Sequence, residues 1–179
     1  ERREGVAGSV TFINLEGTRP ILIEIQALVD KSMLPNPKRL TVGTDAQRLT
    51  MLLAILHRHV TLSTYDQDVF LNAVGGIKIN ETASDLAVLI AIVSSMTNQA
   101  VSSKTAIFGE VGLGGEIRPV SRGQERIKEA SKLGFKRIIV PLKNKASDIP
   151  DVEIIGVDNL RDAVKVVFGS NRVKNDEQI

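Results

Sequence analysis

The stretch that decides the fold is residues 82–97, TASDLAVLIAIVSSMT. Its centre, residues 86–93, is apolar without a break. Such a run is too long for a typical strand and too short for a membrane span, which needs about 20 apolar residues. We therefore predict a buried helix in the centre of a folded domain.

Strand and helix signals precede this central helix. Residues 9–15 and 20–29 are rich in β-branched and apolar residues, and the turn signal EGTR at 16–19 separates them, which predicts a hairpin. A two-proline loop that carries Lys38 and Arg39 follows. Asp45 is a suitable N-cap for an amphipathic helix over 45–59, where leucines recur at helical spacing.

Further strands and helices surround the centre of the chain. Residues 68–74 form a predicted strand that ends at Gly75-Gly76, and the alternation of 77–80 points Lys78 away from two isoleucines. Beyond the central helix we expect, in order, strands near 105–111 and 115–120, a charged helix over 122–133, strands over 137–140 and 153–157, and a helix over 159–168. This order predicts an α/β sandwich with a mixed sheet.

Length and composition suit one domain. The chain has 179 residues, of which 42% are apolar but only 3% aromatic, so aliphatic side chains must fill the core. We expect the domain to occupy residues 9–169, with 1–8 as the N-terminal end of a longer protein, because the first residue is not Met. Residues 170–179 are predicted to be a disordered polar tail.

Several functional classes are disfavoured by composition. The chain has no Cys, which excludes disulfides and thiolate chemistry and is ordinary for a cytoplasmic protein. We expect no membrane span, since no apolar run is long enough. The net charge of +2 permits a nucleic-acid partner without arguing for one, so the positions of the charges must decide.

Two further motifs do not indicate a nucleotide-binding or metal-binding site. The glycine-rich residues 109–115 lead from strand to strand, whereas a dinucleotide-binding loop must open a helix, so we predict a hairpin. No phosphate loop with Gly-Lys-Ser or Gly-Lys-Thr occurs, and therefore no ATPase site is expected in this chain. His57 and His59 are too few for a metal site without carboxylates, and no metal is predicted.

Three segments in order resemble one family. They are EGTRP at 16–20 with EIQALV at 24–29, DQDV at 66–69 through GGIK at 75–78, and FGEVGL at 108–113 through GEIRPV at 115–120. Together they resemble the C-terminal domain of bacterial DNA repair protein RadA, also called Sms. The likeness covers residues 8–168.

That domain is similar in turn to the proteolytic domain of Lon, which uses a Ser nucleophile and a Lys base. The resemblance implies a Lon-like fold and places the nucleophile position at Ala83, in TASD at 82–85, and the base position at Gln124, counted from Pro119-Val120. A methyl group cannot attack and a neutral amide cannot act as the base. We therefore expect no proteolytic activity.

One alternative interpretation is that the chain is a residual serine hydrolase with a relocated site. Ser84 lies one residue beyond the nucleophile position, and Lys78 or Lys104 could serve as a displaced base. However, one helical step turns a side chain by about 100°, so Ser84 should not point where Ala83 points. As a serine at a helix start it already has a structural explanation.

The resemblance also implies a function. RadA joins a zinc finger and a RecA-like ATPase to this domain, forms hexameric rings and drives branch migration on DNA. ATP, magnesium and zinc are thus expected only in the missing domains. This chain is expected to be the oligomerisation and DNA-binding module, with single-stranded or branched DNA held by backbone contacts; a pure ring scaffold without DNA contact is the remaining alternative.

Basic residues at turns and strand edges are the candidate DNA contacts. They are Arg19, Lys38, Arg39, Lys78 and Arg118. Each alone is as well explained by surface solvation, but as a set they could neutralise phosphates. A second set on the 122–133 helix and just beyond it, Arg122, Arg126, Lys128, Lys132 and Lys136, is interleaved with Glu125 and Glu129 and is expected to form a salt-bridged solvent face.

Overall fold

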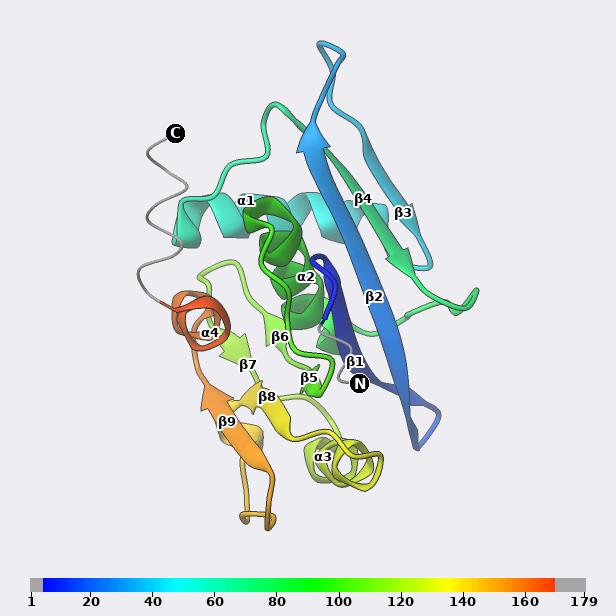
Figure 1. Ribbon diagram of the computed structural model, residues 1–179, viewed down its shortest axis with the longest axis vertical. Helices are drawn as coiled ribbons and strands as arrows, with labels where there is room; N and C mark the ends of the chain where they lie inside the picture. Colours follow the sequence, from blue (N-terminus) through cyan, green and yellow to red (C-terminus); the bar gives the residue numbers. More distant parts are fainter. Residues whose placement is uncertain (1–4, 170–179) are drawn as a thin grey trace.

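The computed structural model describes residues 5–169 (Figure 1). The predicted tail over 170–179 and the first four residues lie outside the described residues. The strands are β1 (Ser9–Glu16), β2 (Arg19–Lys31), β3 (Arg39–Val42), β4 (Gln67–Ala73), β5 (Thr105–Ile107), β6 (Glu110–Val111), β7 (Ile117–Arg118), β8 (Arg137–Pro141) and β9 (Glu153–Val157). The helices are α1 (Ala46–Val60), α2 (Asp85–Thr97), α3 (Gly123–Lys132) and α4 (Leu160–Phe168), with short 3-10 turns η1 (Thr82–Ser84) and η2 (Leu142–Asn144).

Seven strands form one mixed sheet in the order β3-β4-β2-β1-β5-β8-β9. β2 pairs antiparallel with both β1 and β4, and the remaining neighbours in this sheet are parallel. β6 and β7 form a separate antiparallel hairpin. The predicted mixed α/β class is confirmed, and residues 109–115 lie in and around a hairpin, as predicted.

The central helix α2 is the core of the molecule. Every residue from Leu86 to Val93 is exposed by 3% or less. Burying a Leu or Ile side chain contributes about 1.5 to 3 kcal/mol, so this helix is a major source of stability. None of the helices within residues 5–169 is long and apolar enough to cross a membrane.

The two faces of the sheet are covered unequally. On β2, residues from Ile23 to Asp30 alternate between buried and exposed, and the buried ones face α2. Ile13 on β1 is paired with Leu22 and belongs to the opposite face, yet it is fully buried, because α3 packs on β1 and β2 there. Beyond α3 no helix within residues 5–169 covers this opposite face.

Two local predictions were wrong. Arg39 is the first residue of β3, a short strand that pairs in parallel with β4, and not a loop residue. The proline loop hid this strand because only four residues follow it before the Gly43 turn. Residues 77–80 are not a strand; the Ile79 N–H donates to the Gly43 carbonyl at 2.8 Å, but Ile77 is 37% exposed while Ile79 is buried.

Candidate functional site

The nucleophile position lies at the start of α2. Ala83, in η1, is 4% exposed, and its carbonyl accepts a hydrogen bond of 2.8 Å from the Gly109 N–H. The Gly109 carbonyl accepts in turn from the Leu86 N–H at 3.0 Å. These bonds fix the helix start against the chain between β5 and β6, and the side chain at the expected nucleophile position is the methyl group of Ala83.

The base position lies on the first turn of α3. Gln124 is exposed, and its side-chain amide donates to the Asn144 carbonyl at 2.7 Å. Asn144 also bonds the Val120 N–H and carbonyl through its own amide group, at 2.8 and 3.1 Å. Gln124 is therefore part of the contact between α3 and η2.

Beside these positions lies a buried ion pair that the sequence did not reveal. Arg126 on α3 is fully buried, and its guanidinium donates to both carboxylate oxygens of Glu81, at 2.6 and 3.0 Å. It also donates to the carbonyls of Ile13 and Ser121 and lies 5.6 Å from the centroid of the Phe108 ring. The expectation that Arg126 belongs to a solvent face was wrong.

The Glu81–Arg126 pair completes the edge of β1. β5 pairs with β1 only at Thr11 and Phe12. Further along, the Ile13 carbonyl accepts from Arg126 at 2.7 Å and the Leu15 N–H donates to Glu81 at 3.1 Å. Two side chains thus supply the hydrogen bonds that a longer β5 would have supplied.

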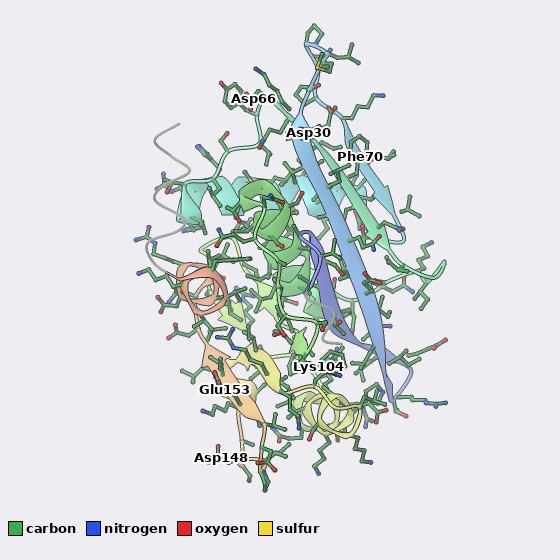
Figure 2. The ribbon with its side chains drawn as sticks, in the orientation of Figure 1. Asp30, Asp66, Phe70, Lys104, Asp148 and Glu153 are labelled. Atoms are coloured by element: carbon green, nitrogen blue, oxygen red, sulfur yellow. The ribbon has the colours of Figure 1, made fainter. Side chains whose placement is uncertain are left out.

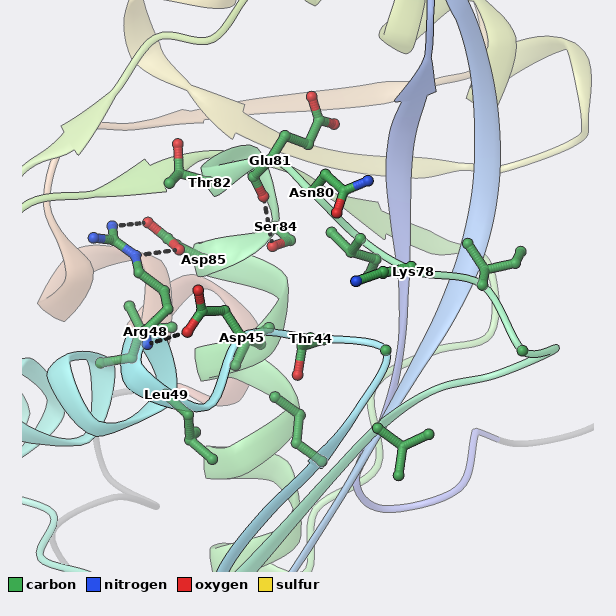
Figure 3. Close-up of a pocket in the computed structure, with 18 residues that line it drawn as sticks. Thr44, Asp45, Arg48, Leu49, Lys78, Asn80, Glu81, Thr82, Ser84 and Asp85 are labelled. Carbon is green, nitrogen blue, oxygen red and sulfur yellow. Dashed lines mark hydrogen bonds and ion pairs between the residues drawn. The ribbon is translucent and has the colours of Figure 1, made fainter.

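Ser84 has a structural partner. Its side chain is buried, and its hydroxyl donates to the Glu81 carbonyl at 3.0 Å instead of capping α2, which corrects the expected capping role. Lys78 lines the same cavity as Ser84, but the hydroxyl is directed to the carbonyl (Figure 3). Lys104 precedes β5 and lies about 16 Å of extended chain from Gly109, the residue that touches Ala83.

A second buried carboxylate anchors α2 to α1. Asp85 is 1% exposed and accepts hydrogen bonds from Arg48 Nε at 3.0 Å, from Arg48 Nη2, and from the Val111 N–H at 3.0 Å. Burial raises the pKa of the Asp85 carboxyl, and the bonds from Arg48 and Val111 oppose this by favouring the carboxylate. The hydrogen bond to Asp85 raises the pKa of Arg48.

A cavity of about 550 Å³ lies beside this helix start, between α1, α2 and the segment that follows β4 (Figure 3). Its floor is apolar and includes Leu49, Leu71 and Val88. Lys78 and Asn80 supply polar groups at its wall. Ala83 and Gln124 do not line it, so the cavity is not centred on the two dyad positions.

The candidate DNA contacts do not converge on one surface. Arg39 is half-buried, and its guanidinium donates to the carbonyls of Lys38, Gln67 and Thr64. Because Arg39 pairs with Val69 and Val69 with Val29, it lies across the sheet from Val29. Arg19 is ten residues earlier on β2, about 33 Å away along the strand.

Lys78 and Arg118 occupy different environments. Lys78 is exposed, as predicted, and shares a cavity of about 570 Å³ with Gly17 in the β1–β2 turn, two residues before Arg19. Arg118 on β7 forms an ion pair of 3.0 Å with Glu116. The structure thus places Lys78 near the turn that precedes Arg19, whereas Lys38 and Arg39 lie at the other end of β2.

No metal cluster occurs in the described part of the chain. Residues 5–169 contain no group of three His, Cys, Asp or Glu side chains placed to hold a metal ion. His59 Nε2 lies 2.9 Å from the Leu113 carbonyl. This contact joins the end of α1 to the β6–β7 hairpin.

Fold and site together define a mixed α/β domain whose central helix begins at a buried segment around Ala83. Residues 51–144 match the family model described as subunit ChlI of Mg-chelatase. The DNA repair protein RadA of Pseudomonas aeruginosa is 55% identical over 167 residues, which are 93% of this chain and 37% of that protein. RadA of Haemophilus influenzae is 54% identical over 92% of the chain and 36% of that protein, and RadA of Bacillus subtilis 44% identical over 94% and 37%.

The chain belongs to the family that this model describes, and over more than nine tenths of its length it is similar to one part of bacterial DNA repair protein RadA. It spans a little over a third of the length of these relatives, 36 to 37%.

Proposed function

We propose that this chain is the non-proteolytic assembly and DNA-contacting domain of a RadA-type DNA repair protein. The observation that carries the proposal is the 55% identity to DNA repair protein RadA over 93% of the chain. In this proposal the ATP-driven branch-migration motor, with its magnesium and zinc, resides elsewhere in a longer cytoplasmic protein, and the domain supports a hexameric ring.

The geometry of the site supports the non-proteolytic part. Ala83 has no nucleophilic atom, and Gln124 is engaged with Asn144. Ser84 is 8% exposed and its hydroxyl already donates to a carbonyl. A serine nucleophile needs a base within hydrogen-bond reach, and no hydrogen bond among residues 5–169 joins Ser84 to a basic side chain.

For DNA contact the structure favours Arg19 and Lys78 over Arg39 and Arg118. Both are exposed, and among residues 5–169 neither forms an ion pair. The Arg39 guanidinium already donates hydrogen bonds to three backbone carbonyls, and Arg118 already forms an ion pair with Glu116. Aromatic residues are only 3% of the chain, so the expected contact is with the phosphate backbone and not with stacked bases.

A salt titration of DNA binding tests this proposal. Binding of this chain to single-stranded and branched DNA should weaken steeply as salt rises, because phosphate contacts release counterions. Changing Arg19 and Lys78 together to Ala should lower the logarithmic salt slope by about one unit per contact, equally for all DNA sequences.

The matched control changes two exposed lysines elsewhere, Lys143 in η2 and Lys165 in α4, to Ala and removes the same charge. An equal loss in both double variants would show that only net charge matters and would refute the proposed contacts. A parent protein without salt-sensitive binding would leave the pure scaffold as the function.

A further inference from the structure

Among the described residues, no helix covers the outward face of β3, β4 and the adjoining part of β2. Leu28 on β2, Phe70 on β4 and Leu40 on β3 are direct neighbours in register and form an apolar row across three strands. Leu28, Leu40 and Val42 are 59, 56 and 55% exposed. We call these four apolar residues the bare sheet face, and the charged residues around them its rim.

The rim of the bare sheet face is acidic. On the outward side of β2, Asp30 is the next residue after Leu28 and Glu24 lies two outward positions before it, beyond Gln26, while Asp68 lies opposite Asp30 on β4. The Lys38 N–H donates to Asp68 at 2.6 Å, and this bond lowers the pKa of that carboxyl. The rim thus carries three carboxylates, and the cations that act on Asp68 are Lys38 and Arg39, whose guanidinium donates to three backbone carbonyls.

A second exposed apolar group has the opposite surroundings. Leu133 follows the last turn of α3 and is 55% exposed, and the chain then turns at Gly134, whose φ is +89°. Around it lie exposed lysines: Lys128 and Lys132 on α3, Lys136 beyond the turn, and Lys104, whose carbonyl accepts from the Lys136 N–H at 2.9 Å. We call Leu133 and these four residues the lysine knob.

The four lysines of the knob lack acidic partners. Among residues 5–169 none of them forms an ion pair, and α3 contributes only Arg126 to such a pair, so the predicted salt-bridged face on this helix was wrong. Glu129 is the one carboxylate within the last turn and a half of α3. Figure 2 shows Lys104 beside α3, toward the opposite end of the molecule from Asp30 and Phe70.

We propose that the bare sheet face of one copy docks the lysine knob of a second copy of this chain. The inference rests on the assembly part of the proposed function and names the surfaces that carry it. Leu133 would enter the apolar row of Leu28, Phe70 and Leu40, while the lysines meet Glu24, Asp30 and Asp68. An apolar centre with a polar, charge-matched rim is the usual anatomy of a protein interface.

The two surfaces differ, so the contact is head-to-tail. Each copy then keeps one free bare face and one free knob, and further copies add until a ring closes. A patch-to-patch dimer would instead place carboxylates against carboxylates, which electrostatics disfavours.

Cross-linking at introduced cysteines tests the docking, since the chain has no Cys of its own. Leu40→Cys and Lys132→Cys are made as separate variants that carry tags of different mass, and each is oxidised alone and as a mixture. We expect a disulfide-linked dimer in the mixture, containing one copy of each variant, and no dimer in either variant alone. The L40C/K132C double variant should give a ladder of oligomers.

Exchanging the charges of one residue on each surface is a second test of the docking. Lys132→Glu should raise the dissociation constant for self-association by about tenfold, and adding Asp30→Lys should restore it, because the pair again has opposite charges. Lys165→Glu, an exposed change on α4, is the matched control and should have no effect.

Each outcome decides the docking proposal. A dimer of L40C with itself would show a patch-to-patch contact and overturn it, as would self-association that is indifferent to K132E. A chain that sediments only as a monomer would overturn the docking and remove the assembly part of the proposed function. Salt-dependent DNA binding, measured on the same samples, tests the DNA-contacting part of the proposed function independently of the docking.

Discussion

Arg126 and Glu81 lie 45 residues apart in the chain and meet because α3 packs over the end of β1. In the sequence Arg126 belongs to a charged helix with regular alternation of sign, and such a pattern predicts solvent exposure. Burial was decided instead by the short β5, which leaves the Ile13 carbonyl without a strand partner. A buried carbonyl without a partner is costly, and Arg126 satisfies it.

Changing Arg126 to Ala should therefore destabilise the fold strongly. The variant leaves Glu81 without its ion pair and two carbonyls without a donor. Removing one partner of a buried pair costs about 3 to 5 kcal/mol, and because Glu81 is 25% exposed we expect the lower end, about 3 kcal/mol. Urea unfolding followed by circular dichroism measures this.

Lys128→Ala on the same helix is the control for that change, and it should alter the free energy of unfolding by less than about 0.5 kcal/mol. Equal effects of the two substitutions would mean that the Glu81–Arg126 pair adds nothing to stability beyond a surface charge.

At the scale of single residues, we expect the chain to have no proteolytic activity. The chain should cleave unfolded protein and fluorogenic peptides no faster than buffer does, because Ala83 and Gln124 offer neither nucleophile nor base. Ser84→Ala should leave this unchanged, since its hydroxyl serves the Glu81 carbonyl. Cleavage that disappears in Ser84→Ala would establish a relocated hydrolase site in place of the proposed function.

At the scale of elements, long periodic segments were predicted well and short ones poorly. The helices over 45–59, 82–97, 122–133 and 159–168 are present with nearly the expected bounds, because side-chain periodicity and caps are local signals. β3 was missed because four residues carry little periodicity. The alternation over 77–80 was misleading, since only one backbone bond ties this segment to Gly43.

The candidate site was predictable only where it depends on local sequence. The assignment of dyad positions to Ala83 and Gln124 rests on motif resemblance and stays a prediction. Two ion pairs near this helix start, Glu81 with Arg126 and Arg48 with Asp85, join distant segments and could not be read from the sequence. The position of Asp85, one residue after a serine at the start of a buried helix, was the available hint that it needs a cationic partner.

Asp45 is the local signal that the structure confirms most directly. Its carboxylate accepts from the N–H groups of Gln47 and Arg48 at 2.8 and 3.1 Å and caps α1. Asp45→Ala should cost about 1 kcal/mol of unfolding free energy, whereas Asp45→Asn, which keeps an acceptor, should cost much less. Equal losses in the two variants by urea unfolding would assign the effect to charge, through Arg48, and not to capping.

At the scale of the whole molecule, α1, α2 and α4 cover one face of the sheet, and within residues 5–169 the other face is covered by α3 alone (Figure 1). A monomer of this kind leaves an apolar row of three strands in water and a short edge strand, β3, without an outer partner. Isolated exposed apolar side chains are common, but a contiguous row with a charged rim is typical of an interaction surface.

Assembly and DNA binding should consequently be linked. One copy offers few phosphate contacts, so its binding should be weak, whereas a ring holds several copies on one DNA and multiplies their effect. Leu28→Ser with Leu40→Ser alters the bare sheet face without changing any charge. We expect this variant to remain folded, to lose self-association, and to bind long DNA about a hundredfold more weakly.

The salt dependence separates this loss from a loss of phosphate contacts. On a short DNA that accommodates one copy, the Leu28→Ser, Leu40→Ser variant should bind like the parent with the same salt slope, because Arg19 and Lys78 are intact. The Arg19→Ala, Lys78→Ala variant should show a lower slope on both lengths. If the serine variant binds long DNA as tightly as the parent while remaining monomeric in sedimentation, assembly does not serve DNA binding, and the two parts of the proposed function are independent.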